Sequence, residues 1–418
     1  MISRESFVAL RYRNYRLLWI GLFVSFTGSM MQNSALLWHV SRLAPPDQKG
    51  LALGMVGLSK VVPIIIFSML SGVIADAFDR RKVMLFAQFG ATAVAAALAV
   101  LTFRGVSVLW PIYALAALGA AVGSFDMPAR QALIPMLVPR EHLPNAISLN
   151  TIMFQTASVL GPALGGLMVG AFGHEREIVG VGGVYVANAM SFAFVVLSLL
   201  MMREVPARQK SEAGSRDDVS LHAAIEGLRF VFRAPLIRST MLLDFFATFF
   251  SSATALLPIF AQDVLRVGPQ GYGWLYAAPA AGALVTSGVM VVATDRIERR
   301  GPVLLWAIAG YGVATVIFGL SRYFWLTFAC LALVGATDTV STIIRNMIRQ
   351  LETPDRLRGR MTGINMVFFM GGPQLGELEA GVVANWLGAT VSVVTGGIGC
   401  LMVTAWVAAT TPLRRYAR

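Results

Sequence analysis

Twelve apolar runs, each long enough to cross a bilayer, dominate the chain and leave it few ways to fold. A membrane span needs about 20 apolar residues, and every backbone polar group inside the bilayer needs an internal partner, which a helix provides. The runs form two groups of six separated by a polar break. They lie at residues 16–40, 51–75, 83–104, 108–130, 144–172 and 181–202, and at 237–262, 270–293, 302–321, 323–345, 360–386 and 388–411. The sequence therefore predicts an all-α polytopic membrane protein with 12 transmembrane helices.

The composition supports a membrane protein and excludes several other classes. Hydrophobic residues make up 56% of the chain and charged residues 13%, whereas soluble domains carry about 25% charged residues. We interpret the net charge of +12 as topological, because Lys and Arg concentrate in cytoplasmic loops, and we expect no nucleic-acid partner. Cys330 and Cys400 both fall in apolar runs, which predicts neither a disulfide nor a metal site. Without a catalytic or nucleotide-binding motif, we expect no cofactor and no enzymatic activity.

The polar break divides the chain into three predicted regions. These are an N-terminal six-helix bundle at 1–202, a cytoplasmic linker at 203–235 and a C-terminal six-helix bundle at 236–418. An apolar stripe in the linker predicts a helix lying on the membrane surface, formed by Leu221, Ile225, Leu228 and Phe232. Few basic residues fall on the opposite side, namely Arg42, Lys49, Arg104, Arg176, Arg266 and Arg322. Both termini are therefore expected in the cytoplasm.

Three sequence signals occur twice, in the same order, about half a chain length apart. A charged turn after the second run returns after the eighth. The segments 130–139 and 345–354 both begin with Arg and end with Pro, and the Gly-Pro pair at 161–162 returns at 372–373. The repetition indicates a duplication. Because each half has an even number of predicted spans, the halves share one orientation about an axis along the membrane normal.

The repeated motifs resemble those of the major facilitator superfamily. The turn Gly72-x-x-Ala-Asp76-x-x-Asp79-Arg80-Arg81-Lys82 is similar to its loop 2–3 signature, and Gly161-Pro162-x-x-Gly165-Gly166 to the fifth-helix signature of its antiporters. Segments 13–19, 128–135 and 255–258 resemble the branch that contains the enterobactin exporter and the transmembrane secretion effectors. The sequence departs from many relatives at Gly28-Ser29, where they carry an acid, and in lacking their fourth-helix Arg. Both departures argue against proton coupling through the residues that many relatives use.

The resemblance implies a charge cluster that latches the two halves on the cytoplasmic side. In the family, an acid ending the second helix, an Arg one turn on and a fourth-helix acid form it. The matching residues are Asp76, Arg80, Arg81 and Asp126. Asp295 and Arg299 form the weaker copy in the second half, and the role of Asp338 there is open. A solvated ion pair contributes only about 0–1 kcal/mol, yet it can bias a two-state equilibrium. The alternative is a positively charged cytoplasmic loop with incidental ion pairs.

Charged residues inside the spans are the sharpest functional clues, because each costs at least about 2.5 kcal/mol at the bilayer centre unless it is paired or faces a cavity. Lys60 and Glu377 lie at similar depths in the second and eleventh runs. Those helices are neighbours in the resembled fold, so we expect the two side chains to pair across the halves. Alternatively, Lys60 extends toward the headgroups and Glu377 faces water. The role of Glu379 is open.

Polar stripes on several runs predict a cavity. Asp244 is followed one turn later by Thr248, and similar stripes occur in the first, fifth and eleventh runs. The predicted cavity residues are Ser25, Ser29, Gln32, Gln155, Thr248 and Gln374. For the hydroxyl groups the alternative is hydrogen bonding between helices. Asp244 and Glu377 are the expected proton-coupling groups, because carboxylates in partly dry cavities exchange protons near the working pH.

Glycine–proline pairs predict bending points in the fifth and eleventh helices. Proline removes an intrahelical hydrogen bond, and glycine lets neighbouring backbones approach. The residues are Gly161, Pro162, Gly372 and Pro373. A static kink is compatible with this hinge.

We expect a secondary transporter in a bacterial inner membrane. The resemblance implies export by alternating access, and the soft, sparsely charged cavity walls favour a bulky amphipathic solute such as a siderophore or drug. Proton antiport is the expected coupling. The alternatives are a lipid or lysolipid flippase, a facilitative uniporter and, in another class, a membrane receptor or scaffold without transport. The expected partners are the solute, the proton and membrane lipids, and the chain is expected to be a monomer.

Overall fold

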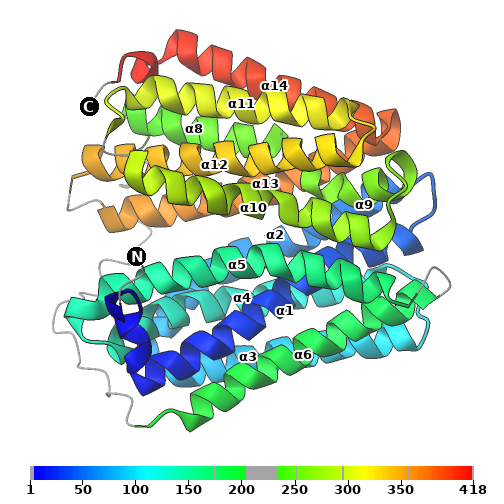
Figure 1. Ribbon diagram of the computed structural model, residues 1–418, viewed down its shortest axis with the longest axis vertical. Helices are drawn as coiled ribbons and strands as arrows, with labels where there is room; N and C mark the ends of the chain where they lie inside the picture. Colours follow the sequence, from blue (N-terminus) through cyan, green and yellow to red (C-terminus); the bar gives the residue numbers. More distant parts are fainter. Residues whose placement is uncertain are drawn as a thin grey trace. The chain divides into compact units, whose positions relative to one another are not determined.

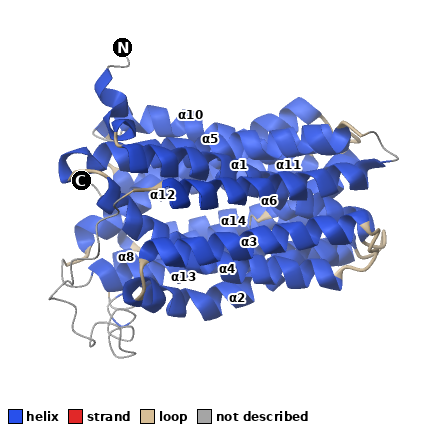
Figure 2. Cartoon of the chain, turned by 90° about the horizontal axis from the view of Figure 1, so that it is seen from below, coloured by secondary structure: helices blue, strands red, loops and turns tan. Residues whose placement is uncertain are grey.

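The computed structural model describes residues 4–172, 176–203, 234–250, 252–293, 296–354 and 358–416, with residues 229 and 231. Side chains are described over these ranges except at 4–6, 68–77, 253, 358–360 and 362–370. The described backbone is helical and contains no strand (Figure 2). The predicted all-α class is therefore confirmed for this part of the chain.

The helices of the first half run in chain order from the N-terminus to the polar break. They are η1 (Arg4–Arg11), α1 (Arg13–Leu43), α2 (Lys49–Ala77), α3 (Arg80–Phe103), α4 (Trp110–Leu137), η2 (Arg140–His142), α5 (Leu143–Gly170) and α6 (Glu177–Met201). Proline residues lie inside α2, α4 and α5. Each of these long helices nevertheless continues through its proline.

The helices of the second half follow the linker (Figure 1). They are α8 (Pro235–Phe250), η5 (Ala253–Leu256), α9 (Leu257–Ile259), η6 (Phe260–Val264), α10 (Gly268–Ala293), α11 (Arg300–Leu320), α12 (Phe324–Glu352), α13 (Arg358–Leu387), α14 (Ala389–Thr410) and η9 (Pro412–Arg415). Ten helical segments of the described residues are long and apolar enough to cross a membrane, and α1 and α13 are not among them. The protein is a multi-pass membrane protein.

The same pairs of corresponding helices pack together in the two halves. In the first half α1 contacts α5 and α6, α3 contacts α4 and α6, and α5 contacts α6. In the second half α8 contacts α13 and α14, α11 contacts α12 and α14, and α13 contacts α14. Thus α1 corresponds to α8, and α2 to α6 correspond in order to α10 to α14. The duplication inferred from three motifs extends to the helix packing.

The chain folds into two compact units whose boundaries do not follow the polar break. The first consists of Met1–Pro46, Ser59–Arg208 and Arg266–Ala277, and the second of Asp47–Leu58, Gln209–Leu265 and Ala278–Arg418. Both α2 and α10 are therefore shared, because the first residues of each helix belong to a different unit from the rest. The predicted linker helix lies outside the described residues.

Each unit has its own apolar core, and large apolar side chains also cover its outer surface. Tyr15, Met84 and Leu149 are buried in the first unit, and Leu243, Ile308 and Ile348 in the second. Phe86 and Trp306 are 83% and 78% exposed. A soluble protein rarely exposes so much apolar surface, but hydrocarbon tails of lipid cover it readily.

Two observed helices differ in detail from the predicted runs. α4 extends past residue 130 to Leu137, so Arg130 lies inside the helix. The seventh predicted span, 237–262, falls within Pro235–Val264, which is long and apolar enough to cross a membrane. Its described helix is not regular, because a 3₁₀ turn and the π-helical η6 follow α8.

Candidate functional site

The centre of the candidate site is an ion pair buried inside the second unit. Arg345 Nη1 on α12 lies 2.8 Å from Asp244 Oδ1 on α8. Both side chains are almost completely buried, with exposed fractions of 2% and 3%. The N–H bonds of Arg345 do not point along the line to Oδ1, so this carboxylate oxygen has no aligned hydrogen bond among the described residues. The predicted intramembrane charge at Asp244 thus has a partner that the sequence did not assign to it.

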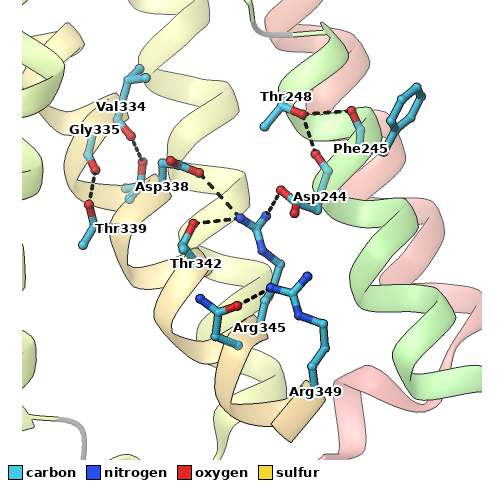
Figure 3. Close-up of polar contacts among 12 residues, drawn as sticks. Asp244, Phe245, Thr248, Val334, Gly335, Asp338, Thr339, Thr342, Arg345 and Arg349 are labelled. Atoms are coloured by element: carbon cyan, nitrogen blue, oxygen red, sulfur yellow. Dashed lines mark hydrogen bonds and ion pairs between the residues drawn. The ribbon is translucent and has the colours of Figure 1, made fainter. Parts of the chain in front are cut away.

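Two further charged residues complete what we call the four-charge cluster: Asp244, Asp338, Arg345 and Arg349. Arg345 Nη2 lies 3.8 Å from Asp338 Oδ1 and donates a hydrogen bond to Thr342 Oγ1 at 2.9 Å (Figure 3). Arg349 is buried one turn further along α12, where it donates to Asn346. The side chain of Asp338 is 47% exposed. The cluster therefore combines one enclosed and one accessible carboxylate.

A small pocket adjoins the four-charge cluster. It is lined by Ala247, Thr248, Ile308, Tyr311, Asp338, Ser341 and Arg345. Ser341 Oγ, Arg345 Nε and Arg349 Nη1 are buried and have no hydrogen-bond partner among the described residues. The pocket has room for about one water molecule. Unpaired buried polar atoms beside such a pocket are suited to a bound water or to the polar end of a solute.

The corresponding place in the first unit has a different chemistry. Arg130 on α4 forms an ion pair with Asp126 at 2.6 Å, and Gln88 on α3 donates to the same carboxylate at 2.9 Å. The guanidinium of Arg130 lies 4.4 Å from the ring centroid of Phe26 on α1. Arg130 and Arg345 are equivalent residues of the two halves. Arg130 faces an aromatic ring on α1, whereas Arg345 faces a carboxylate on α8. The duplicated scaffold carries its enclosed acid–base pair on the α8 side.

The charged turn after α2 ties three helices of the first unit together. Asp79 is the N-cap of α3, and its carboxylate accepts a hydrogen bond from the backbone N–H of Arg81 at 2.9 Å. Arg80 donates to the carbonyl of Ala132 on α4, and Arg81 to that of Leu200 on α6. These contacts fix the turn by charge-assisted hydrogen bonds to exposed helix carbonyls.

The predicted latch between the halves remains a prediction. The side chain of Asp76 and the whole of Asp295 lie outside the described residues. Asp126 is placed with Gln88 and Arg130, and Arg299 precedes the first turn of α11 as its N-cap. The structure thus places Arg80 and Arg81 at the start of α3 and Asp126 inside α4, without a direct ion pair between them in the described contacts.

Helix crossings at glycine bring α13 against α2 and α5 against α10. A Cβ atom added to Gly57 on α2 would lie 2.9 Å from Glu377 Oε2, so this carboxylate lies directly over the glycine. In the other crossing, a Cβ added to Gly166 on α5 would lie 2.7 Å from the Cα of Gly273 on α10. Gly166 and Glu377 are the last residues of the two copies of the Gly-Pro motif. Where the first copy has Gly166, the second has Glu377. The crossing of α13 with α2 therefore contains a carboxylate that the related crossing of α5 with α10 lacks.

The first glycine of each Gly-Pro motif packs against the first helix of its own unit. Gly161 lies against Thr27 and Met30 of α1, and Gly372 against Phe245 and Thr248 of α8. Both α5 and α13 continue through Pro162 and Pro373 without a break in the helix. Close packing at these glycines is established in the described residues, and the predicted bending remains a prediction.

The polar stripes make more local contacts than the sequence suggested. Gln32 accepts a hydrogen bond from Asn188 on α6 at 2.8 Å, and Ser25 is buried in the first unit. Thr248 donates to the carbonyl of Asp244 at 2.8 Å, as the hydroxyl groups along α5 do to the preceding turn. Hydrogen bonds from a hydroxyl to a carbonyl of its own helix are common for Ser and Thr. From the sequence we expected only cavity lining or hydrogen bonds between helices. Ser29, Gln155 and Gln374 are half-buried, and their cavity role remains a prediction.

The remaining intramembrane charges lie in different units. Lys60 Nζ is 3.5 Å from Asn33 Oδ1 of α1, in the first unit. Glu377 and Glu379 are half-buried on α13, in the second. Pairing of Lys60 with Glu377 remains a prediction. No group of three His, Cys, Asp or Glu side chains that could hold a metal ion occurs in the part of the chain that the structure describes.

Similarity to known families decides what kind of protein carries this cluster. The family described as transmembrane secretion effector matches residues 4–417, nearly the whole chain. The chain belongs to this branch of the major facilitator superfamily. Two of its relatives are the MFS-type transporter YfiS of Bacillus subtilis strain 168 and the enterobactin exporter EntS of Shigella boydii serotype 18. Each is 27% identical, over 84% and 85% of this chain and 82% and 81% of the relative.

Solved structures of other transporters show the same fold as this chain. The nucleoside transporter NupG aligns with a TM-score of 0.74 at 11% identity, over 95% of this chain and 99% of that one. The D-xylose-proton symporter aligns with a TM-score of 0.71 at 12% identity, over 95% and 98% of the two chains. At such low identity the likeness concerns the fold alone. The resemblance inferred from the motifs is confirmed, and the matched proteins are transporters.

Proposed function

We propose that this protein is a secondary exporter that moves a bulky amphipathic small molecule, such as a siderophore or drug, across the bacterial inner membrane. Membership of the secretion effector family supports transport, and the enterobactin exporter among the relatives supports the outward direction. The proposed topology has 12 spans and two cytoplasmic termini, in agreement with the distribution of Lys and Arg. The chain acts as a monomer among membrane lipids.

The observation that carries the proposal is the buried ion pair of Asp244 and Arg345. Ionisable residues at membrane depth are costly, and they typically mark a substrate or proton pathway. The pair lies beside a pocket with unpaired polar atoms in an otherwise apolar bundle. We therefore assign proton antiport to this protein, with the four-charge cluster as its coupling site and Glu377 as a second candidate.

Alternating access supplies the transport cycle in this proposal. The Gly-Pro motifs of α5 and α13 are the bending points, and the charged turn with Asp126 is the cytoplasmic latch. Lys60 and Glu377 pair on the outer side when the cavity faces inward. Ion pairs of this kind bias an equilibrium between conformations although each contributes little to stability.

Proton release from the purified protein in detergent tests the proposal. Enterobactin and ethidium serve as probes of a siderophore and of a cationic drug. The variants are Asp244→Asn, Asp338→Asn and Glu377→Gln, and the matched control is Asp263→Asn, an exposed carboxylate paired with Lys49. We expect release on adding one of the probes, lost in at least one of the three variants and kept in the control. Binding of both probes without any release would instead indicate a uniporter or a flippase.

A further inference from the structure

The two carboxylates of the four-charge cluster are held very differently by the same guanidinium. Asp244 lies 2.8 Å from Arg345, with a side chain that is 3% exposed. Asp338 lies 3.8 Å from Arg345, with a side chain that is 47% exposed. Asp244 is thus enclosed by protein at the shorter distance, whereas Asp338 is held more loosely and lines a pocket with room for about one water molecule, through which a proton could reach it.

We propose that Asp338 carries the coupling proton, and that Arg345 shifts its ion pairing between Asp338 and Asp244 as this proton leaves and returns. The inference rests on the proposed proton antiport and makes its site specific. Asp244 is then a positioning residue, because it holds Arg345 within reach of Asp338 and does not itself exchange the proton.

Charge balance explains why the position of Arg345 would follow the proton. With both aspartates ionised, the two acids and two arginines of the cluster are balanced, and Arg345 lies between two carboxylates. When Asp338 binds a proton, one positive charge is in excess, and the only ionised carboxylate near Arg345 in the cluster is Asp244. On its own helix, Arg345 donates one hydrogen bond to Thr342 and lies 3.8 Å from Asp338.

The titratable groups that could compete with Asp338 as proton carriers come from four packed helices. Asp244 is the carboxylate on α8, and Arg349 is the second base on α12. Tyr311 on α11 lines the same pocket, and Cys400 on α14 interacts with Tyr311; phenols and thiols are weaker acids than carboxylic acids. Asp338 is the one accessible carboxylate among them, and it lines the pocket together with Ser341, whose hydroxyl has no partner among the described residues.

Infrared difference spectroscopy of the full-length protein in detergent tests this assignment without a transported solute. The measurement follows the C=O stretch of protonated carboxyl groups as the pH is lowered, in wild type, Asp338→Asn, Asp244→Asn, Arg345→Lys and the control Asp263→Asn. We expect Asp338→Asn to lose one component of the titrating band, and the control, which loses only the contribution of Asp263, to retain that component. In Asp244→Asn the band should persist but appear at lower pH, because Arg345 is then free to pair with Asp338 alone. Arg345→Lys should move it to higher pH, because a single ammonium group cannot bridge both carboxylates.

The assignment would be overturned if Asp338→Asn lost only the component expected for any carboxyl group, one that does not shift in Arg345→Lys, or if the component assigned to Asp338 disappeared in folded Asp244→Asn. If Asp244→Asn does not fold, the shift of the band to higher pH in Arg345→Lys and the loss of the Asp338 component in Asp338→Asn still decide the question. The proposed antiport fails separately, if ethidium or enterobactin export by cells is unaffected when a protonophore collapses the proton gradient. The two tests therefore distinguish a wrong residue from a wrong mechanism.

Discussion

Replacing Asp244 with Asn should destabilise the protein strongly, because it removes the closer of the two carboxylates beside Arg345, a residue that is only 1% exposed, and leaves Asp338 at 3.8 Å. Two unit charges 4 Å apart attract each other by about 4 kcal/mol at an effective dielectric constant of 20. Breaking a buried ion pair from one side typically costs about 3–5 kcal/mol. We expect a value near the lower end, about 3 kcal/mol, because the Asn amide oxygen still accepts a hydrogen bond.

Thermal unfolding in detergent at a fixed scan rate measures this effect. A loss of 1 kcal/mol lowers the Tm of a unit of about 200 residues by roughly 2–4 °C, so Asp244→Asn should lower it by about 6–12 °C. The double variant Asp244→Leu with Arg345→Met removes both charges and should recover most of this loss. Asp263→Asn, at a carboxylate whose side chain is 50% exposed, is the matched control and should change the Tm little. A double variant as unstable as the single one would refute the reasoning.

Three further substitutions test other features of the structure. Gly166→Val should abolish transport, because its side chain would collide with the α10 backbone. Gly288→Ala is the control: a Cβ there meets open space, so transport should be unchanged and the helix should gain up to about 1 kcal/mol of stability. Equal transport activity of the two variants would exclude tight packing at the crossing of α5 and α10. Arg130→Met should cost about 1–2 kcal/mol, measured as a lower Tm, through the lost ion pair and cation–π contact, and an unchanged Tm would contradict it. Lys60→Ala and Glu377→Ala should each impair export, and the charge-swapped double variant should restore part of it in a cellular efflux assay; a double variant as inactive as the singles would remove the proposed pair.

The sequence predicted the class of protein, the duplication and the family because these depend on patterns that repeat along the chain. Runs of about 20 apolar residues specify helices whatever their neighbours are. The motif pairs placed Arg130 and Arg345 at equivalent positions, and the packing of corresponding helices agrees with this. Helix ends were less predictable: α4 continues through Pro135 to Leu137, beyond the end of the apolar run.

The contacts of the candidate site could not be predicted, because they depend on which helix faces meet. Asp244 was identified as a functional charge, but Arg345 appeared in the sequence only as a marker of the repeat, at the end of an apolar run. A buried acid requires a buried base, and the repeat offered Arg345 on a helix of the same half, so this requirement is the signal that would have found it. The hydroxyl pattern was incomplete for a related reason: Thr248 lines the pocket, and its hydroxyl also donates to a carbonyl of its own helix.

The shared helices α2 and α10 have a consequence for biosynthesis. Residues 266–277 belong to the compact unit that contains most of the N-terminal half, and residues 47–58 to the unit that contains most of the C-terminal half. During translation the ribosome completes α1 to α6 before it has made the segment that finishes their unit. Residues 47–58, in turn, leave the ribosome long before α13, the helix that packs against them, exists. Each compact unit includes a segment from the other half of the sequence. Because the N-terminal half is synthesised first, its unit stays incomplete until residues 266–277 have been made.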